Sequence, residues 1–241
     1  MRPVSAKFVP RLLTYHQKEN RVEICQVLLA SANGYGNFRK KIITGDETWV
    51  YGYDVETRMQ SSQWMGKGSP RPKKARMSQS KIKVMFVVFF HWKGIVLHEF
   101  VPRGQMVNKQ FYQEVLARLR DAVGRKRPEL WENETCMLHH DNAPAPASLL
   151  IRSYLAKRQT SVVPHPTYSP DLTPADFFLF PRLKTTLKER RFQTIEEIQE
   201  NAIREMRAIT ESSFQEAFQQ WKKRWERCIA SRGDYFEGDS A

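Results

Sequence analysis

The chain has 241 residues, of which 41% are hydrophobic and 27% charged, so a packed core is expected and wholesale disorder is excluded. Lysine and arginine number 39 against 26 aspartates and glutamates, and the resulting net charge of +13 favours a polyanionic partner, nucleic acid before an anionic membrane. Three scattered cysteines exclude a disulfide framework and a zinc finger, and the longest apolar run is far shorter than the about 20 residues of a membrane helix. A basic soluble protein without such a partner is the remaining alternative on charge alone.

The first part of the chain predicts an arm, a helix and a strand. Residues 1–20 are basic and interrupted by prolines, which is typical of an arm or linker. Residues 20–40 have apolar side chains at helical spacing. Residues 41–54 are rich in β-branched and aromatic side chains, so we expect a strand that contains Asp46.

A basic loop is predicted at 66–83. Between Thr57 and His98 the chain has nine basic residues and no acidic one, and the middle of this stretch has the glycine, proline and serine content of a loop. Its cations are candidate phosphate contacts, with a solvated loop as the alternative. The DNA-binding residues predicted here and at the basic end of the following helix are Lys67, Arg71, Lys73, Lys74, Arg76, Lys81, Arg125, Lys126 and Arg127.

The rest of the chain alternates short apolar segments with helical periodicities. Strands are predicted at 83–90, 94–101, 135–141 and 161–166, and helices at 108–127 (stopped by Pro128), at 148–158, from Pro174, and after capping boxes at Thr194–Glu197 and Ser213–Glu216. Trp221 and Trp225 share an apolar stripe of the last helix, so we predict that they belong to the core. This order of elements predicts an α/β fold with a mixed sheet flanked by helices.

Three aspartates stand out by their positions. Asp46 lies within the first strand, Asp141 ends a short strand, and Asp176 lies just inside a helix. An ionised carboxylate in or at the end of an apolar strand is costly unless it meets a cation, and three together repel unless divalent ions neutralise them. Mg²⁺ takes a few carboxylates and completes its shell with water and phosphate, which suits displacement at phosphorus by two metals.

Each aspartate also has an ordinary structural interpretation, which the spacing leaves open. Asp46 is compatible with a turn at the end of a strand, and Asp141 with an Asx turn that continues into Asn142. Asn142 is alternatively a group that orients a carboxylate or binds phosphate. Asp176 is compatible with a favourable place near a helix N-terminus.

The polar neighbours of these aspartates are expected to be structural. Glu47 follows Asp46 in a strand, so it is expected on the opposite face and is not predicted as a ligand. His139 and His140 are expected to be hydrogen-bonded structural histidines. Asp171 is expected to form a turn and to cap a helix.

Three motifs carry a resemblance to a known family. TGDE at 44–47, HHDNAP at 139–144 and YSPDLTPADFFLFP at 168–181 resemble, in this order, the catalytic core of mariner-family DNA transposases. The 34 residues between Asp141 and Asp176 match the family's spacing between its second and third aspartates. KFVPRLL at 7–13 and RWERCIASRGDYFEGD at 224–239 are also similar to the family, so the resemblance spans nearly the whole chain.

The resemblance implies an RNase H-like fold and cut-and-paste transposition. Asp46, Asp141 and Asp176 would be the catalytic metal ligands for Mg²⁺, with Mn²⁺ as a substitute. The enzyme would cleave phosphodiester bonds at transposon ends and join the freed 3′-hydroxyl to target DNA. It also implies double-stranded DNA and a second copy of the chain as partners. The short apolar runs predict no membrane partner, and we expect a nuclear location, with which PRPKKAR at 70–76, similar to a nuclear-import signal, is compatible.

The sequence departs from the family's pattern in two places. It begins at the linker, so 1–20 is expected to be the linker, 21–241 the catalytic domain with its insertion at 66–83, and the helix-turn-helix region that reads transposon ends is expected to be missing. Pro146 stands where many relatives have histidine. The alternative function is therefore an inactive, truncated remnant that only binds DNA or dimerises. A nuclease of RNA–DNA hybrids is disfavoured by the 34-residue spacing and the C-terminal motif.

Overall fold

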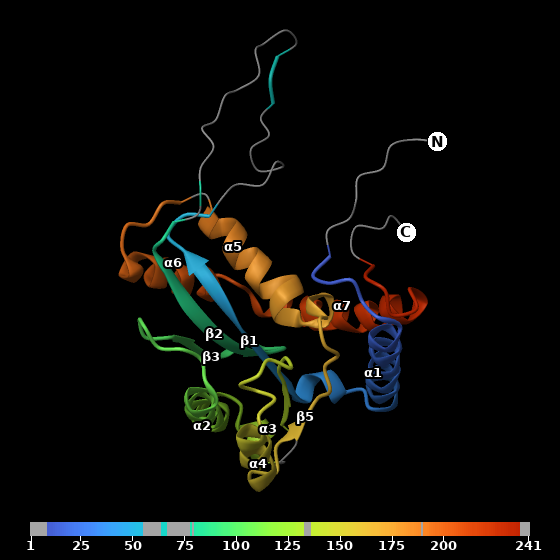
Figure 1. Ribbon diagram of the computed structural model, residues 1–241. Helices are drawn as coiled ribbons and strands as arrows, with labels where there is room; N and C mark the ends of the chain where they lie inside the picture. The colour runs from blue at the N-terminus through green and yellow to red at the C-terminus, as the bar shows by residue number, and fades with distance from the viewer. Residues whose placement is uncertain are drawn as a thin grey trace.

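In the computed structural model the chain forms one five-stranded sheet flanked by helices (Figure 1). The structure describes residues 9–54, 64–66, 78, 80–132, 136–188 and 190–236. The strands are β1 (Ile42–Tyr51), β2 (Lys83–His91), β3 (Gly94–Phe100), β4 (Met137–His139) and β5 (Ser161–Val162). The helices are α1 (Tyr15–Gly34), α2 (Lys109–Lys126), α3 (Pro128–Glu132), α4 (Leu149–Lys157), α5 (Phe180–Lys188), α6 (Ile195–Arg207) and α7 (Glu211–Ala230), with short 3₁₀ turns at Phe38–Lys41 and Pro170–Leu172 and a π-helical turn at Ala175–Leu179.

The sheet is mixed, as predicted, and its strand order is β3-β2-β1-β4-β5. β1 and β2 pair antiparallel along their length, and β2 continues antiparallel into β3. β4 runs parallel to β1 but pairs only with its first three residues, Ile42 to Thr44. From Gly45 onward β1 therefore has no β4 partner on that side, and the chain that leaves β4 passes this open edge.

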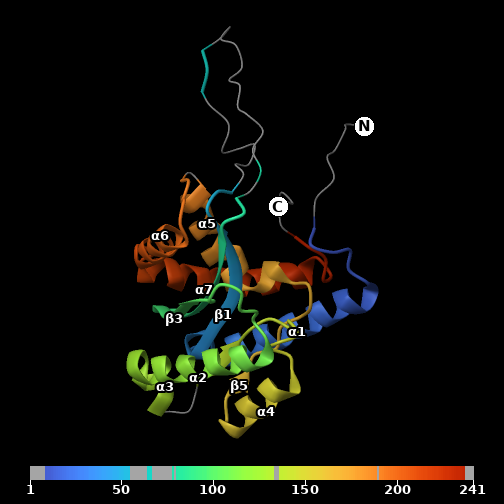
Figure 2. The same ribbon diagram turned by 60° about the vertical axis from the view of Figure 1, so that its left-hand side comes forward.

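Helices cover both faces of the sheet (Figures 1 and 2). α5, α6 and α7 lie on one face and α2, α3 and α4 on the other, while α1 packs beside α7. The two cores share β2, whose residues alternate between them: Phe86, Val88 and Phe90 belong to the first, Val87 and Phe89 to the second. Burial on both faces explains why KVMFVVFF is apolar almost without interruption. No helix within the described residues is both long and apolar enough to cross a membrane.

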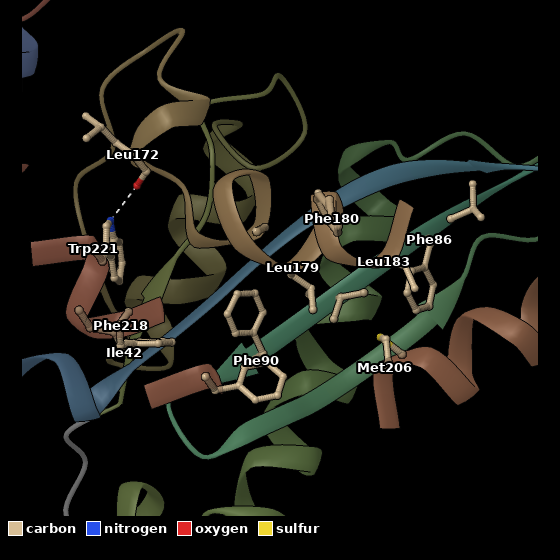
Figure 3. Close-up of a cluster of buried hydrophobic side chains, with 14 of the residues drawn as sticks. Ile42, Phe86, Phe90, Leu172, Leu179, Phe180, Leu183, Met206, Phe218 and Trp221 are labelled. Atoms are coloured by element: carbon tan, nitrogen blue, oxygen red, sulfur yellow. Dashed lines mark hydrogen bonds between the residues drawn. The ribbon is translucent and has the colours of Figure 1, made fainter. Parts of the chain in front are cut away.

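The larger core lies between the sheet and α5, α6 and α7 (Figure 3). Phe90 stands at its centre, with its ring centroid 5.6 Å from that of Phe214 and 6.2 Å from that of Phe218. Trp221 and Trp225 are completely buried, and the Trp221 indole nitrogen donates a 2.7 Å hydrogen bond to the carbonyl of Leu172. The prediction that both tryptophans belong to the core is confirmed.

Local hydrogen bonds place several helix ends differently from the sequence prediction. The helix predicted at 20–40 begins at Tyr15, because the Thr14 side chain caps it, and ends at Gly34. Thr194 caps α6 as predicted. The cap predicted at Ser213 is wrong: α7 begins at Glu211, because the Thr210 hydroxyl accepts from the backbone nitrogen of Ser213.

A buried ion pair joins α1 to the segment before α5. The Arg21 guanidinium donates to both carboxylate oxygens of Asp171, at 2.9 and 2.6 Å, and its Nε donates to the carbonyl of Gly233. The two side chains are 0% and 3% exposed. Asp171 does lie in a turn, as predicted, but the predicted capping role is wrong because its carboxylate faces Arg21. The sequence offered no sign of this pair, since its members lie 150 residues apart.

Candidate active site

The three aspartates come from three separate elements. Asp46 lies in the middle of β1, opposite Val88 of β2. Asp141 lies two residues beyond the end of β4, and Asp176 lies in the π-helical turn that leads into α5. Gly45 is required beside Asp46, because a Cβ there would collide with the ring of Phe89.

Backbone contacts hold two of these carboxylates in place. The backbone nitrogen of Glu47 donates to Asp46 Oδ1 at 2.7 Å, and that of Ala143 donates to Asp141 Oδ1 at 3.0 Å. The second contact is the Asx turn that the sequence left open for Asp141. This turn is compatible with a role of Asp141 in the site, because it fixes the direction in which the carboxylate points after the strand ends.

Several acidic side chains lie close together at the open edge of β1. One carboxylate oxygen from each of Asp46, Glu47 and Asp141 lies within 4.8 Å of the others. Asp176 is close enough to be the neighbouring charge with the largest effect on the pKa of Asp46. The structure thus brings together all three aspartates singled out in the sequence and adds Glu47.

Burial and mutual repulsion raise the pKa values of this cluster. Burial and then the charges of Asp176, Glu47 and Asp141 raise the pKa of Asp46 to about 9, and burial and Asp141 raise that of Glu47 to about 7. Burial raises the pKa of Asp176 to about 6 against the opposing charge of Lys184, and it also raises the pKa of Asp141. These carboxylates repel one another when they are ionised, and a divalent cation would offset this repulsion. Carboxylate oxygens are also the ligands that Mg²⁺ and Mn²⁺ prefer, so the cluster fits either ion.

Glu47, which was not predicted as a ligand, contributes a carboxylate oxygen to this cluster. Strand alternation starts its side chain from the face opposite Asp46, as predicted. In agreement with this, its charge has the largest effect after burial in raising the pKa of Tyr112 on α2. However, β4 ends at His139 and leaves the edge of β1 uncovered at this point. A glutamate side chain is long enough to reach around that edge to Asp46 and Asp141.

The two histidines before Asp141 are structural, as predicted. His139 Nδ1 hydrogen-bonds the hydroxyl of Thr44 at 2.8 Å, and His140 Nδ1 hydrogen-bonds the hydroxyl of Tyr112 at 2.9 Å. Burial lowers the pKa of His140 to about 4 and that of His139 well below its usual range, so both rings are neutral at pH 7. Asn142 donates to the carbonyl of His165 and not to a carboxylate. Pro146 lies buried in the turn before α4.

The predicted DNA-binding cations divide into three groups. Five of them, Lys67, Arg71, Lys73, Lys74 and Arg76, lie outside the described residues. Lys81 is exposed just before β2. At the end of α2, Arg125 and Lys126 are exposed and Arg127 is half-buried. Lys126 donates to the carbonyl of Val96, and Arg127 donates to the ring of His91. This end lies about 20 Å along the helix from Tyr112, which neighbours the acidic cluster.

Sequence reasoning missed one cation beside the site. Lys184 of α5 is half-buried, and the charges of Asp176, Asp54 and Asp46 all act on its ammonium group. Its eight-residue distance from Asp176 does not suggest a shared face in a regular helix, so only recognition of the π-helical turn between them would have found it.

Comparisons with known proteins show which proteins this chain resembles. A family model described as Transposase (partial DDE domain) matches residues 54–133. The Mariner Mos1 transposase of Drosophila mauritiana is 33% identical over 232 residues, which cover 96% of this chain and 66% of that protein. The human histone-lysine N-methyltransferase SETMAR is 28% identical over 96% of this chain and 33% of its own length. The chain thus spans about two thirds of the first relative and a third of the second.

Solved structures extend the similarity to the fold. The Mos1 mariner paired end complex with Mn has a TM-score of 0.88 at 30% identity, covering 98% of this chain and 68% of that one. The catalytic domain of Mos1 has a TM-score of 0.79 at 30% identity, covering 95% of this chain and all of that one. The predicted RNase H-like α/β fold is therefore confirmed, and the chain belongs to the mariner family of DNA transposases.

Proposed function

We propose that this chain is the catalytic part of a DNA transposase, which cleaves phosphodiester bonds at transposon ends and transfers the freed 3′-hydroxyl into target DNA. The observation that carries the proposal is the cluster of Asp46, Asp141 and Asp176 at the open edge of β1. It is supported by structural similarity to Mos1 complexes described as a pre-cleavage transpososome and a strand transfer complex.

In this proposal the three aspartates hold Mg²⁺, or Mn²⁺ in its place, as the similar Mos1 structures with Mg and with Mn support. The chemistry that such ions supply when bound is activation of the attacking oxygen and stabilisation of the leaving oxygen. The chain's own part is to fix the ligands. Asp46 is held by β1, Asp141 by the Asx turn that follows β4, and Asp176 by the π-helical turn that precedes α5.

The partners in this proposal are double-stranded DNA and a second copy of the chain, in the nucleus. The net charge of +13 supports DNA binding, and contacts that do not depend on DNA sequence typically give a dissociation constant of about 10⁻⁴–10⁻⁶ M. The paired-end and transpososome complexes of Mos1 support assembly on transposon ends. The nine predicted basic residues would contact phosphates, and among those described Lys81, Arg125 and Lys126 are exposed.

Nicking of supercoiled plasmid by the purified chain in Mn²⁺ or Mg²⁺ tests the proposal. We expect nicking by the wild type, none by Asp46→Asn, and wild-type rates for Asp121→Asn, which removes an exposed carboxylate of α2 outside the cluster. Equal nicking by wild type and Asp46→Asn would overturn the proposal. A folded wild type that binds DNA but nicks with neither metal would favour the inactive remnant, and a preference for RNA–DNA hybrids would favour the nuclease.

A further inference from the structure

Lys184 lies on the same helical face as Asp176, although eight residues separate them. In a regular α-helix a residue eight positions on is rotated by about 80° from the first, because each residue turns by about 100°. The π-helical turn at Ala175–Leu179, in which the Phe180 nitrogen bonds the Ala175 carbonyl, inserts one extra residue into the helix. With one residue taken up by this turn, Asp176 and Lys184 are related as two residues seven positions apart in a regular helix. Lys184 therefore lies two turns beyond Asp176 and is rotated about the helix axis by only about 20° from it.

The Lys184 side chain runs back along the helix towards Asp176. Helical side chains lean towards the N-terminus, which for α5 is the end that carries the acidic cluster. The ammonium nitrogen lies 5.9 Å from the ring centroid of Phe180, one turn earlier, as this direction requires. A lysine that follows this path brings its charge to the rim of the site.

The ammonium group stays available in spite of its acidic neighbours. Burial lowers the pKa of Lys184, and the charges of Asp176, Asp54 and Asp46 oppose this effect, which places all three within electrostatic reach. Among the described residues, however, no hydrogen bond or ion pair engages its nitrogen, whereas Lys188, one turn further, pairs with Asp54. Lys184 lines a narrow cleft between the end of β1 and α5, next to Trp49 and Asp54.

We propose that Lys184 binds a phosphate of the DNA strand beside the scissile bond and so positions that strand over the carboxylates. This inference rests on the proposed function. A half-buried ammonium group that forms no ion pair with the described carboxylates is suited to an anion that arrives with the substrate, and DNA supplies one phosphate with every nucleotide.

The test compares Lys184→Met, which keeps the length and packing of the stem, with Lys184→Arg and with Lys157→Met, which removes an exposed lysine of α4. We expect Lys184→Met to nick about ten- to hundredfold more slowly than wild type, the usual worth of one charged hydrogen bond. Lys184→Arg is expected to recover most of the rate, and Lys157→Met to match wild type.

Two binding measurements separate this role from a structural one. The slope of DNA affinity against salt concentration, on logarithmic axes, is expected to fall by about one in Lys184→Met. Affinity for Mn²⁺, measured by calorimetry without DNA, is expected to be kept or increased, because a cation beside the carboxylates has been removed.

Wild-type nicking by Lys184→Met, or an unchanged salt slope, would overturn the inference. So would a rate loss matched by an equal loss of Mn²⁺ affinity, since Lys184 would then act on the carboxylates and not on DNA. If the wild type binds DNA but nicks with neither metal, the catalytic proposal fails, and the salt slope still decides the inference on Lys184.

Discussion

Asp171 and Asp176 lie five residues apart in one motif, yet their carboxylates meet opposite surroundings. Asp171 accepts hydrogen bonds from Nη1 and Nη2 of Arg21, and although burial lowers the pKa of Arg21, this pairing raises it overall. Asp176 lies near the carboxylates of Asp46 and Asp141, and burial raises its pKa although the nearby charge of Lys184, which forms no ion pair with it within the described residues, opposes the shift. A carboxylate that is paired with an arginine side chain stabilises the fold, whereas a carboxylate that lies among other carboxylates remains available to bind a metal ion.

The first way to sharpen this comparison is to remove the charge of Asp176. Asp176→Asn is expected to lower metal-dependent nicking by about 10³-fold or more, because a lost metal ligand removes several kcal/mol of transition-state stabilisation. Its free energy of unfolding without metal should stay equal to that of wild type or rise, since a repelling charge is gone. A urea titration beside the nicking assay measures both. A clear loss of stability would contradict the contrast with Asp171.

For the buried Arg21–Asp171 pair we expect the reverse, which is a large loss of stability when one partner is removed. Arg21→Met leaves Asp171 buried without its partner and should lower the free energy of unfolding by about 3–5 kcal/mol. The double variant with Asp171→Leu should recover most of this loss, because no charge is then left unpaired. Urea denaturation of the three proteins measures these values. A loss below about 1 kcal/mol in Arg21→Met would show that the pair does not hold α1 in place.

Metal binding provides a smaller effect. Mn²⁺ at a hundred times its dissociation constant should stabilise the wild type by about 2.7 kcal/mol, by mass action. Asp46→Asn should lose this gain, and Asp121→Asn should keep it. Thermal unfolding with and without Mn²⁺ measures the shift. An equal shift in Asp46→Asn would place the bound metal elsewhere.

The last prediction concerns pH. The pKa values of Asp176, Glu47 and Asp46 are raised to about 6, 7 and 9 in the folded chain, so these groups favour the fold while protonated. Their contribution is complete below the unfolded values near 4 and is lost as the pH rises through 6 to 9. Metal-free wild type should therefore lose stability over this range, and Asp46→Asn should lose less. Chemical denaturation at several pH values measures this, and identical profiles would contradict it.

The sequence predicted much of the fold because its signals were local. The apolar run at 83–90 predicted the strand β2, and the stripe that contains Trp221 and Trp225 predicted the core face of α7. Helix ends were less certain, because Thr210 and Ser213 offer the same kind of cap and only the backbone decides between them.

The acidic cluster needed more than local signals. The resemblance, and not the spacing, suggested that Asp46, Asp141 and Asp176 meet. Glu47 and Lys184 were missed because their positions depend on where β4 stops and on a π-helical turn, neither of which has a signature in the sequence. The Arg21–Asp171 pair joins distant segments, so no local pattern reveals it.

The most direct test of the account is to locate Mn²⁺ in crystals of the wild-type chain by anomalous diffraction. We predict an anomalous peak between the carboxylates of Asp46 and Asp141, on the side that Asp176 faces, and no such peak in Asp46→Asn. A wild-type crystal at saturating Mn²⁺ with no peak at these carboxylates, or with the same peak in Asp46→Asn, would contradict the claim that this cluster is a metal site.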